Sequence, residues 1–343
     1  MKKTNPHSAG ELPVSETRLN QVSAKPDLQL KPGERADVSL KMILSYLLDV
    51  MEYHQEGIVK DVDPEFLHDY RIAVRRTRSL LGQLKGIFPK QTLDRATRRF
   101  AWLGAATSPL RDMDVYLLAF DGYRESLPAA MRDDLEPVRE FLRAHREHEY
   151  QALVKVFESK RYHTFIEGWR RFLMTPAPVR TSLSNAGRPN IDVVNERIWK
   201  IYRRVIKEGR LIQPDTAPEK LHQLRKTCKK LRYLIEMFRS LYPAGKLKKT
   251  IKALKQLQDN LGLYQDLHVQ ICTLEKLKGQ MQEEGRLPEA TDVAIERLVK
   301  KLNKRQQKQR AEFEGRFSKF STKNNRLLFR TLFRTTPAEM RGV

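Results

Sequence analysis

Two stretches of the chain, 66–89 and 220–243, align without a gap at an offset of 154 residues. The identical pairs are Leu67/Leu221, His68/His222, Arg71/Arg225, Arg78/Arg232, Leu80/Leu234 and Pro89/Pro243. The same offset also gives the pairs Leu103/Leu257, Asp112/Asp266 and Val115/Val269. Self-similarity at a fixed offset predicts a tandem duplicated unit, and we expect pseudo-twofold symmetry between the two copies.

Each copy shows the apolar spacing of an α-helix. In 66–89 the large apolar residues recur at i+3 and i+4, and the stretch ends at a proline. This pattern is typical of an amphipathic helix. Similar patterns run through 38–58, 130–157, 191–212, 246–261, 265–284 and 289–320, and strand-like alternation is not sustained anywhere. The sequence therefore predicts an all-α chain built from helical bundles.

Two proline-containing stretches predict the domain boundaries. Residues 1–35 hold four prolines and few large apolar groups, which indicates a disordered N-terminal arm. Residues 175–190 contain further prolines, which a helix interior does not tolerate, and we expect a linker there. The predicted divisions are repeat 1 at about 36–174, repeat 2 at about 191–335, and a C-terminal tail at 336–343.

The net charge of +23 is concentrated in the duplicated part of the chain. Stretches 66–111 and 220–260 together carry +18, and 300–334 carries +10, so the remainder sums to −5. A solubility surface would not need this concentration, which predicts a polyanionic partner. The stretch 300–334 has two interpretations. It is either a long amphipathic helix that completes the second bundle and adds its Lys and Arg to the anion surface, or an arm that contacts nucleic acid.

The cations of each copy fall on one side of the predicted helix. At 100° per residue they span an arc of about 80° opposite the apolar face. This stripe consists of His68, Arg71, Arg75 and Arg78 in the first copy and His222, Arg225, Lys229 and Arg232 in the second, widened by Arg76, Lys226 and Lys230. The only carboxylates in the two stretches are Asp69 and Glu236, and we expect both outside the stripe.

A row of like charges one turn apart is repulsive unless an anion neutralises it. Arginine donates two hydrogen bonds to a phosphate, and lysine acts as a point charge. A histidine among arginines is expected to stay neutral and to donate one ring N–H to a phosphate oxygen. The duplicated stripe therefore predicts a site for a multiply charged anion. The alternative is a solvated helix face with a histidine near its N-terminus.

Other possible sites are weaker. Asp112 and Asp114, aligned with Asp266 and His268, contain metal-ligand side chains. For Asp112 and Asp266 we favour helix capping or pairing with nearby arginines, because a metal site needs more ligands. Nucleotide-binding, dehydrogenase, esterase and zinc-protease motifs are absent, and so is Cys-x-x-Cys. The chain has only two cysteines, no run of about 18 apolar residues and no secretory signal. We therefore expect a soluble cytoplasmic protein.

Two motifs resemble those of a known family. HDYRIAVRRTRSLL (68–81) and HQLRKTCKKLRYLI (222–235) each place Arg or Lys three, seven, eight and ten residues after a histidine. Each is followed by a shorter signature, LGAATSPLRDMDV (103–115) or LQDNLGLYQDLHV (257–269). Over about 36–335 the chain resembles the CHAD family, the conserved histidine α-helical domain. It resembles a stand-alone member, because the 35-residue arm is too short for the CYTH domain that some members carry.

The resemblance implies two antiparallel four-helix bundles with pseudo-twofold symmetry, and basic residues that line a central surface or pore. It also implies binding of inorganic polyphosphate without hydrolysis, with no catalytic residue, metal or cofactor. The expected binding residues are those of the two stripes, extended by Arg98, Arg99, Lys248, Lys249, Lys252 and Lys255. Association with polyphosphate granules is a further expectation. The alternatives are a nucleic-acid-binding protein and a polyphosphate-metabolising or phosphohistidine enzyme.

Overall fold

The computed structural model describes residues 28–334, and all regular elements in this range are helices. The first half contains α1 (Ala36–Val59), α2 (Pro64–Gln83), α3 (Lys90–Ala106), α4 (Ser108–Ser126), η2 (Ala129–Met131), η3 (Asp133–Leu135), α5 (Glu136–Glu158) and α6 (Lys160–Met174). The second half contains α7 (Asn190–Arg210), α8 (Pro218–Met237), η4 (Arg239–Leu241), α9 (Ala244–Glu283), α10 (Glu289–Phe320) and α11 (Lys323–Phe333). The predicted all-α class is confirmed.

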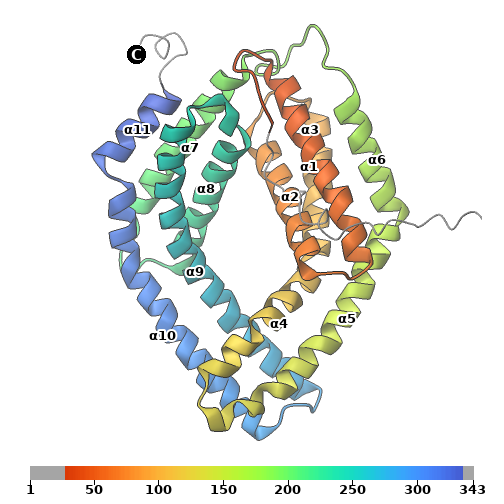
Figure 1. Ribbon diagram of the computed structural model, residues 1–343, viewed down its shortest axis with the longest axis vertical. Helices are drawn as coiled ribbons and strands as arrows, with labels where there is room; N and C mark the ends of the chain where they lie inside the picture. Colours follow the sequence, from red (N-terminus) through yellow and green to blue (C-terminus); the bar gives the residue numbers. More distant parts are fainter. Residues whose placement is uncertain (1–27, 335–343) are drawn as a thin grey trace, which may run out of the picture.

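The helix boundaries reproduce the offset found in the sequence. Helices α1, α2 and α3 begin at residues 36, 64 and 90, and α7, α8 and α9 begin at 190, 218 and 244. Equivalent helices also touch, because α1 packs against α7 and α2 packs against α8 (Figure 1). A twofold relation brings like elements into contact in this way. The symmetry of the whole fold and its grouping into four-helix bundles stay predictions.

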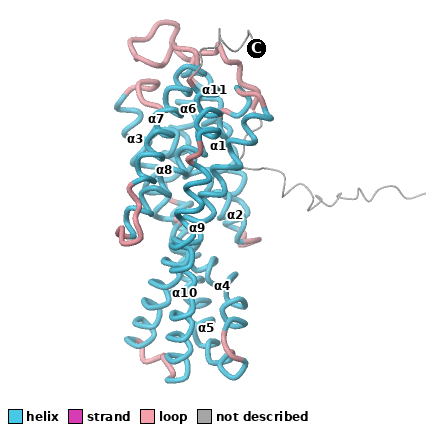
Figure 2. Tube along the Cα trace, turned by 90° about the vertical axis from the view of Figure 1, so that its left-hand side faces the viewer, coloured by secondary structure: helices cyan, strands magenta, loops and turns pink. Residues whose placement is uncertain are grey.

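The apolar core has two parts, and both repeats contribute to each. The larger cluster joins α1, α2, α3 and α6 to α7, α8, α11 and the first half of α9, with Leu44, Tyr70, Phe100, Ile198 and Leu231 among its members. The smaller cluster lies where α4 and α5 meet the second half of α9 and the first half of α10, and it includes Phe120, Phe141, Leu274 and Leu298. Figures 1 and 2 show these four helices at the lower end of the molecule.

The predicted helices 246–261 and 265–284 are in fact one helix of 40 residues, α9. Leu254 and Leu257 belong to the larger cluster, whereas Leu267 and Leu274 belong to the smaller one. At 100° per residue, the buried face turns by about a third of a turn between these halves. The apolar pattern changes direction while the backbone continues, so the sequence pattern suggested two helices. In the first repeat the chain does break at this level, between α3 and α4.

The ends of the predicted domain can be followed only in part. Residues 1–27 of the predicted arm and the predicted tail 336–343 lie outside the described range. Leu30 is buried, and its N–H donates to Ser240 Oγ at 3.1 Å. The Asn190 N–H donates to the Glu34 carbonyl at 2.8 Å. Residues 28–35 are therefore held against η4, which follows α8, and against the start of α7.

The basic stretch 300–334 is helical and packed. It forms the end of α10 and all of α11, and its residues Phe313, Phe320 and Phe329 are buried in the larger cluster. Arg310 donates to three carbonyls of the α7–α8 loop, those of Gln213, Pro214 and Thr216, at 2.6 to 3.2 Å. The prediction that this stretch is helical is therefore confirmed. Its place in a second bundle and its contact with nucleic acid stay predictions.

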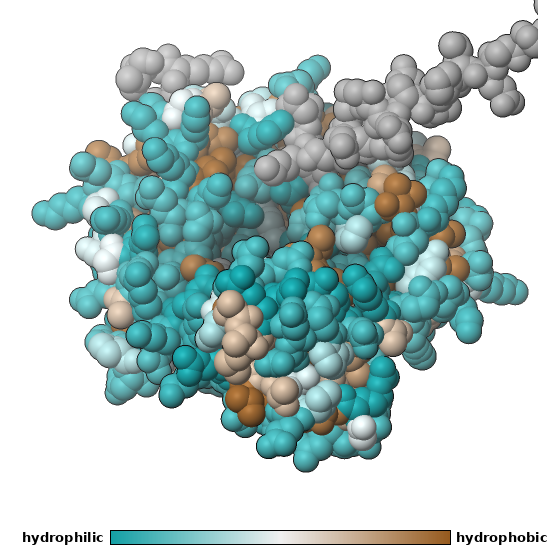
Figure 3. Space-filling view, turned by 60° about the horizontal axis from the view of Figure 1, so that its bottom comes forward, coloured by the Kyte–Doolittle hydropathy of each residue, from teal (hydrophilic) through white to brown (hydrophobic). Residues whose placement is uncertain are grey.

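The outer surface is polar. Seen from the lower end, most of the molecule is hydrophilic, with separate hydrophobic side chains (Figure 3). Within residues 28–334, no helix is both long and apolar enough to cross a membrane.

Candidate anion-binding site

Helix α2 presents the first stripe because its opposite face is fixed in the core. Asp63 caps the helix by accepting a hydrogen bond from the Glu65 N–H at 2.7 Å, and Pro64 occupies its first turn. The buried residues of α2 include Leu67, Tyr70, Ala73, Val74, Thr77, Leu80 and Leu81. With this face in the core, the stripe turns toward the junction of α3 and α4 and toward α8.

Helix α8 repeats the arrangement on the other side of the molecule. Pro218 again opens the helix, and its buried residues include Leu221, Leu224, Cys228, Leu231 and Ile235. Helices α2 and α8 pack against each other and lie on either side of the space that the helices enclose in Figure 1. The second stripe is therefore brought next to the first.

The two stripes meet at Arg75. Its side chain is exposed and makes no ion pair with a carboxylate of residues 28–334. Burial lowers the pKa of Arg71, and the charge of Arg75 lowers it further. Burial and the charge of Arg75 also lower the pKa of Arg225 in α8. Cations from both repeats thus lie close enough to disfavour each other's charged forms.

The pKa of Lys229 shows the closeness of these cations most directly. Its pKa is lowered to about 8, mainly by burial, with Arg225, Arg75 and Arg232 contributing in the same direction. Asp266 opposes the shift but does not cancel it. We call the eight residues His68, Arg71, Arg75, Arg78, His222, Arg225, Lys229 and Arg232 the basic track.

A small pocket of about 120 Å³ opens on the track between α2 and the α3–α4 junction. It is lined by Arg71, Val74, Arg75, Arg78, Gly104, Thr107 and Ser108. Arg71 Nη1 donates to the Gly104 carbonyl at 3.1 Å and to Thr107 Oγ1 at 2.7 Å. A Cβ atom at Gly104 would lie 2.8 Å from Arg78 Nη1, so the glycine allows Arg78 to approach closely. Three guanidinium groups around one small pocket suit a tetrahedral oxyanion.

The second repeat lacks the glycine at the equivalent position. Gln258 takes the place of Gly104 at the 154-residue offset, and its side chain is buried and donates to the Cys228 carbonyl at 2.6 Å. The glutamine therefore fills space that Gly104 leaves open in the first repeat.

Both histidines are held through Nδ1 by the same helix position. Arg111 Nη2 lies 3.0 Å from His68 Nδ1, and the equivalent Gln265 places Oε1 2.7 Å from His222 Nδ1. A guanidinium only donates, so His68 Nδ1 accepts and its proton lies on Nε2. His222 Nδ1 instead donates to the amide oxygen. Burial and the charge of Arg111 lower the pKa of His68, so the neutral donor predicted from the sequence fits His68.

Arg76 differs from the other predicted stripe residues because it is buried. It is 3% exposed, and its Nη2 donates to Glu236 Oε2 at 3.0 Å. Glu236 also pairs with Arg232 Nε at 3.3 Å. The expectation that Glu236 lies outside the stripe was wrong, because fourteen residues after His222 correspond to about 320° on the helix, inside the arc. Arg76 and Glu236 thus connect the two repeats through a buried ion pair.

Tyr233 contributes an aromatic face to the same contact. The guanidinium carbons of Arg75, Arg76 and Arg232 lie 5.8, 5.7 and 5.9 Å from its ring centre. Arginines at this distance from an aromatic face are attracted by its quadrupole. The ring therefore helps to gather cations from both helices.

The aspartates of the shorter signatures pair with arginines. Asp266 Oδ1 lies 3.1 Å from Arg225 Nη2, and Asp114 Oδ1 lies 2.8 Å from Arg146 Nε. Burial raises the pKa of Asp112, and Arg71 and Arg111 oppose that shift. The interpretation that Asp112 and Asp266 pair with arginines is confirmed for Asp266. Across residues 28–334, no three potential metal-ligating side chains are grouped.

The remaining predicted residues lie outside the track. Arg99 lines a different groove, between α3 and α6. Burial and the charges of Arg204 and Arg197 in α7 lower the pKa of Lys230, which places it on the α7 side of α8. By helical angle, three lysines of α9 share a side with Asp266, namely Lys248, Lys252 and Lys255, and Lys249 is turned away from them. Arg98 and Lys226 are exposed.

Three residues of the site were not predicted from the sequence: Arg111, Tyr233 and Glu236. Arg111 reaches His68 only because α4 packs against α2. Tyr233 belongs to the apolar run of α8 and meets Arg75 and Arg76 only through the α2–α8 contact. The position of Glu236 could have been predicted from the sequence, because its helical angle falls within the arc of the stripe.

Comparison with known proteins agrees with this fold. The crystal structure of the CHAD domain from the plant Ricinus communis matches with a TM-score of 0.71 and 23% identity, covering 86% of this chain and 96% of that chain. PptA from Streptomyces chartreusis matches with a TM-score of 0.64 and 13% identity, covering 83% of this chain and 100% of that chain. No curated protein matches the chain. The family model described as the CHAD domain matches residues 42–275, more than half of the chain, and the protein therefore belongs to the CHAD family.

Proposed function

We propose that this protein binds inorganic polyphosphate on the basic track without hydrolysing it. The observation that carries the proposal is the convergence of the two stripes around Arg75 and Lys229. The lowered pKa means that the charged form of Lys229 is less favoured in the free protein than that of an ordinary lysine, and a bound polyanion would favour it. Polyphosphate carries about one charge per unit, and it can offer successive phosphates to successive cations along two helices.

The pocket beside Gly104 supports phosphate as the bound group. It combines three arginines with the hydroxyl side chains of Thr107 and Ser108. The arginines donate hydrogen bonds to oxyanions, whereas the two hydroxyl groups already donate to the Leu103 and Gly104 carbonyls. The lining has no aromatic side chain of the kind on which single-stranded nucleic acids stack their bases. A linear anion without bases is therefore the ligand that we favour.

The environment of His68 supports binding over catalysis. A catalytic histidine is normally oriented by a group that stabilises its charged form. His68 Nδ1 instead faces the Arg111 guanidinium at 3.0 Å, and this cation, together with burial, lowers the pKa of His68. The enzyme alternative predicts phosphate release, or an acid-labile phosphoryl adduct on His68, in the presence of Mg²⁺ or Mn²⁺. Either result would contradict the proposal.

A double charge reversal tests the site. Arg75→Glu combined with Lys229→Glu replaces the two central cations, and we expect affinity for long-chain polyphosphate to fall by more than about 100-fold at about 0.15 M salt. The matched control is Lys155→Glu with Lys160→Glu, which changes the net charge equally on exposed positions of α5 and α6. Fluorescence anisotropy with labelled polyphosphate measures binding, and circular dichroism checks helicity.

Two outcomes of this experiment would contradict the proposal. Equal losses in both double variants would mean that net charge alone attracts the anion. Displacement of polyphosphate by duplex DNA or RNA at equal phosphate concentration would favour the nucleic-acid alternative. In cells, the proposal predicts that a fluorescent fusion associates with polyphosphate granules and that the track variant does not.

A further inference from the structure

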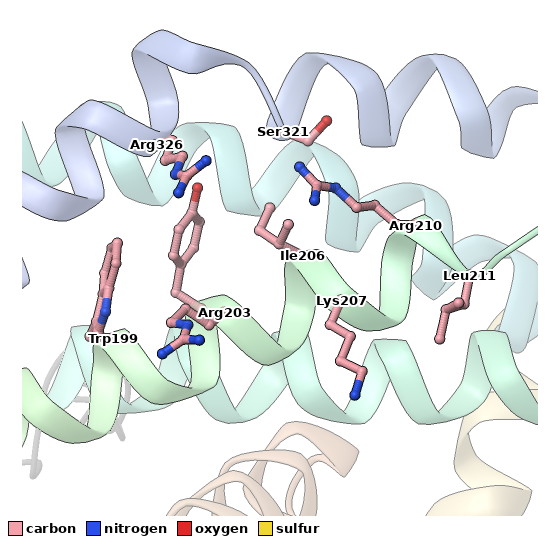
Figure 4. A pocket seen from close by; sticks show the side chains of 9 residues that line it. Trp199, Arg203, Ile206, Lys207, Arg210, Leu211, Ser321 and Arg326 are labelled. Carbon is pink, nitrogen blue, oxygen red and sulfur yellow. The ribbon is translucent and has the colours of Figure 1, made fainter.

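A second basic pocket lies apart from the track, between α7 and the corner where α10 meets α11. Its volume is about 380 Å³. Trp199, Tyr202 and Ile206 supply an apolar and aromatic wall, and Arg203, Arg210 and Arg326 supply positive charge. In Figure 4, Trp199 and Ile206 of α7 point toward the side of α10 and α11, where Arg326 lies, and Arg210 lies near Ser321, whereas Arg203 and Lys207 point away from that side. No residue of the basic track lines this pocket.

The hydroxyl of Tyr202 is buried and has no hydrogen-bond partner among residues 28–334. Tyr202 is 2% exposed, and its ring stacks on Phe329 with centroids 4.0 Å apart and an interplanar angle of 13°. Burial raises the pKa of Tyr202, and the charges of Arg326 and Arg210 oppose that shift, so both guanidinium groups lie near the ring. Buried polar groups are normally satisfied, so an unpaired hydroxyl at a pocket wall indicates a missing acceptor.

The cations around this pocket also lack counter-charges. Within residues 28–334, Arg203, Arg210 and Arg326 form no ion pair with a carboxylate, and neither does Lys207 at the pocket edge. The lining contains no Asp or Glu. The pocket therefore combines an apolar wall with uncompensated positive charge and an unused hydroxyl donor.

The first repeat shows that the fold does not require such a pocket. At the 154-residue offset, Arg203, Ile206 and Arg210 correspond to Asp49, Glu52 and Glu56. Arg170 of α6 pairs with both Asp49 and Glu52. The equivalent face of α1 is thus acidic and covered by an arginine, whereas the face of α7 is basic and open.

We propose that the α7–α11 pocket binds a small phosphate monoester that carries a flat aromatic group. The aromatic group would lie against Trp199 and Ile206, and the phosphate would accept hydrogen bonds from Arg210, Arg326 and the Tyr202 hydroxyl. Apolar walls with a few polar groups are typical of small-molecule sites, and arginine matches phosphate geometry. Polyphosphate has no apolar part, so this ligand differs from that of the basic track.

Isothermal titration of the full chain with 1-naphthyl phosphate tests the proposal. We expect 1-naphthyl phosphate to bind at least about tenfold more tightly than inorganic phosphate or 1-naphthol, because each of these offers only half of the contacts. Adenosine monophosphate serves as a second aromatic phosphate. Equal affinities for 1-naphthyl phosphate and inorganic phosphate would overturn the proposal.

Two variants locate the binding. Ile206→Glu introduces the residue type of Glu52 in the first repeat, and we expect it to abolish 1-naphthyl phosphate binding. Tyr202→Phe removes only the hydroxyl and should weaken binding about three- to tenfold, in line with one lost hydrogen bond to a charged group. If Ile206→Glu does not fold, Arg326→Glu replaces it. Retained affinity in these variants would place the ligand elsewhere.

The basic-track variant keeps this proposal separate from the polyphosphate proposal. Arg75→Glu with Lys229→Glu should leave 1-naphthyl phosphate binding unchanged, and Ile206→Glu should leave polyphosphate binding unchanged. Loss of 1-naphthyl phosphate binding in the track variant would mean that the aromatic phosphate uses the track, and would overturn the pocket assignment.

Discussion

Helices α2 and α8 carry the same basic pattern, yet equivalent residues in them have different partners. Arg76 is buried against Glu236, whereas its equivalent Lys230 is exposed. Arg78 approaches Gly104, whereas its equivalent Arg232 pairs with Glu236. The duplication therefore preserved the order of charges, but neighbouring helices decide whether a cation binds another protein group or stays available.

The cations of the two stripes therefore fall into two groups: those that are available to an anion and those that pair with another group of the protein. Arg75, Arg78 and Lys229 have no ion pair with a carboxylate of the described chain and remain available to an anion. Arg76 holds the two repeats together through Glu236. Variants at equivalent positions can separate these roles, because each pair differs in its surroundings and occupies the same helical register.

The largest expected effect is on stability, at the inter-repeat ion pair. Arg76→Ala leaves Glu236 partly unpaired at the buried α2–α8 contact, and we expect the free energy of unfolding to fall by about 3 kcal/mol. The equivalent substitution Lys230→Ala, at an exposed position, should change it by less than about 0.5 kcal/mol. Urea denaturation measures both. Similar losses of unfolding free energy in the two variants would show that the Arg76–Glu236 ion pair adds no more stability than the exposed Lys230 does.

The next effect is a pH dependence of binding that originates in Lys229. Its pKa of about 8 lies below the ordinary lysine value, so the free protein loses this proton as the pH rises above 8. A bound polyanion favours the charged form, so binding above pH 8 takes up a proton and weakens by up to about tenfold per pH unit. Below pH 8 Lys229 is charged with or without ligand and contributes no pH dependence.

Lys229→Arg provides the control, because arginine stays charged over this range. Titrations at pH 7, 8 and 9 should show a loss of affinity between pH 8 and 9 for the natural chain and a nearly constant affinity for the variant. The groups that act on Lys229 are Arg225 and Arg232 of its own helix, Arg75 of α2 and Asp266 of α9. An equal loss in the variant would assign the pH dependence to other groups.

A smaller difference should separate Arg78 from its equivalent Arg232. Arg78→Ala should weaken polyphosphate binding about five- to tenfold, because an available guanidinium is lost. Arg232→Ala should weaken it only about two- to threefold, since Glu236 already engages the Arg232 Nε. Anisotropy titrations at one fixed salt concentration compare them. The reverse order would mean that Glu236 releases Arg232 when the anion binds.

The smallest expected effect concerns the two histidines. His68 carries its proton on Nε2 because Arg111 donates to Nδ1, so it can donate to a phosphate while neutral. His222 donates from Nδ1 to Gln265 and has no free N–H in its neutral form. At pH 8, His68→Ala should weaken binding about threefold and His222→Ala should have little effect. Equal losses of affinity in the two variants would show that the histidine tautomer does not affect polyphosphate binding.

Much of the fold followed from the sequence because its signals are local and repeated. The 154-residue offset anticipated the starts of three pairs of helices, and i+3 and i+4 spacing identified the buried face of α2. The prediction failed where one helix serves two cores. In α9 the buried face turns between Leu257 and Leu267, so a continuous helix was predicted as two.

The site could be predicted from the sequence only as two separate stripes. Helical angles placed Arg75 and Lys229 opposite the apolar faces of their own helices, but nothing local showed that both act on the same surface. Likewise, Arg76 had the charge of a binding residue, and only the position of Glu236 across the α2–α8 contact gave it a structural role. Long-range partners of this kind are set by packing.

The sequence by itself determined that the chain is helical, that one unit occurs twice, and that each copy carries a histidine-led row of cations opposite its apolar face. These properties depend on residue spacing along a single helix, which the chain specifies directly. The tertiary structure alone decided which cations meet, which are buried, and which face of α7 remains open beside α11. Those outcomes depend on contacts between helices that are distant in sequence, and such contacts determine the burial and charge environment of each side chain.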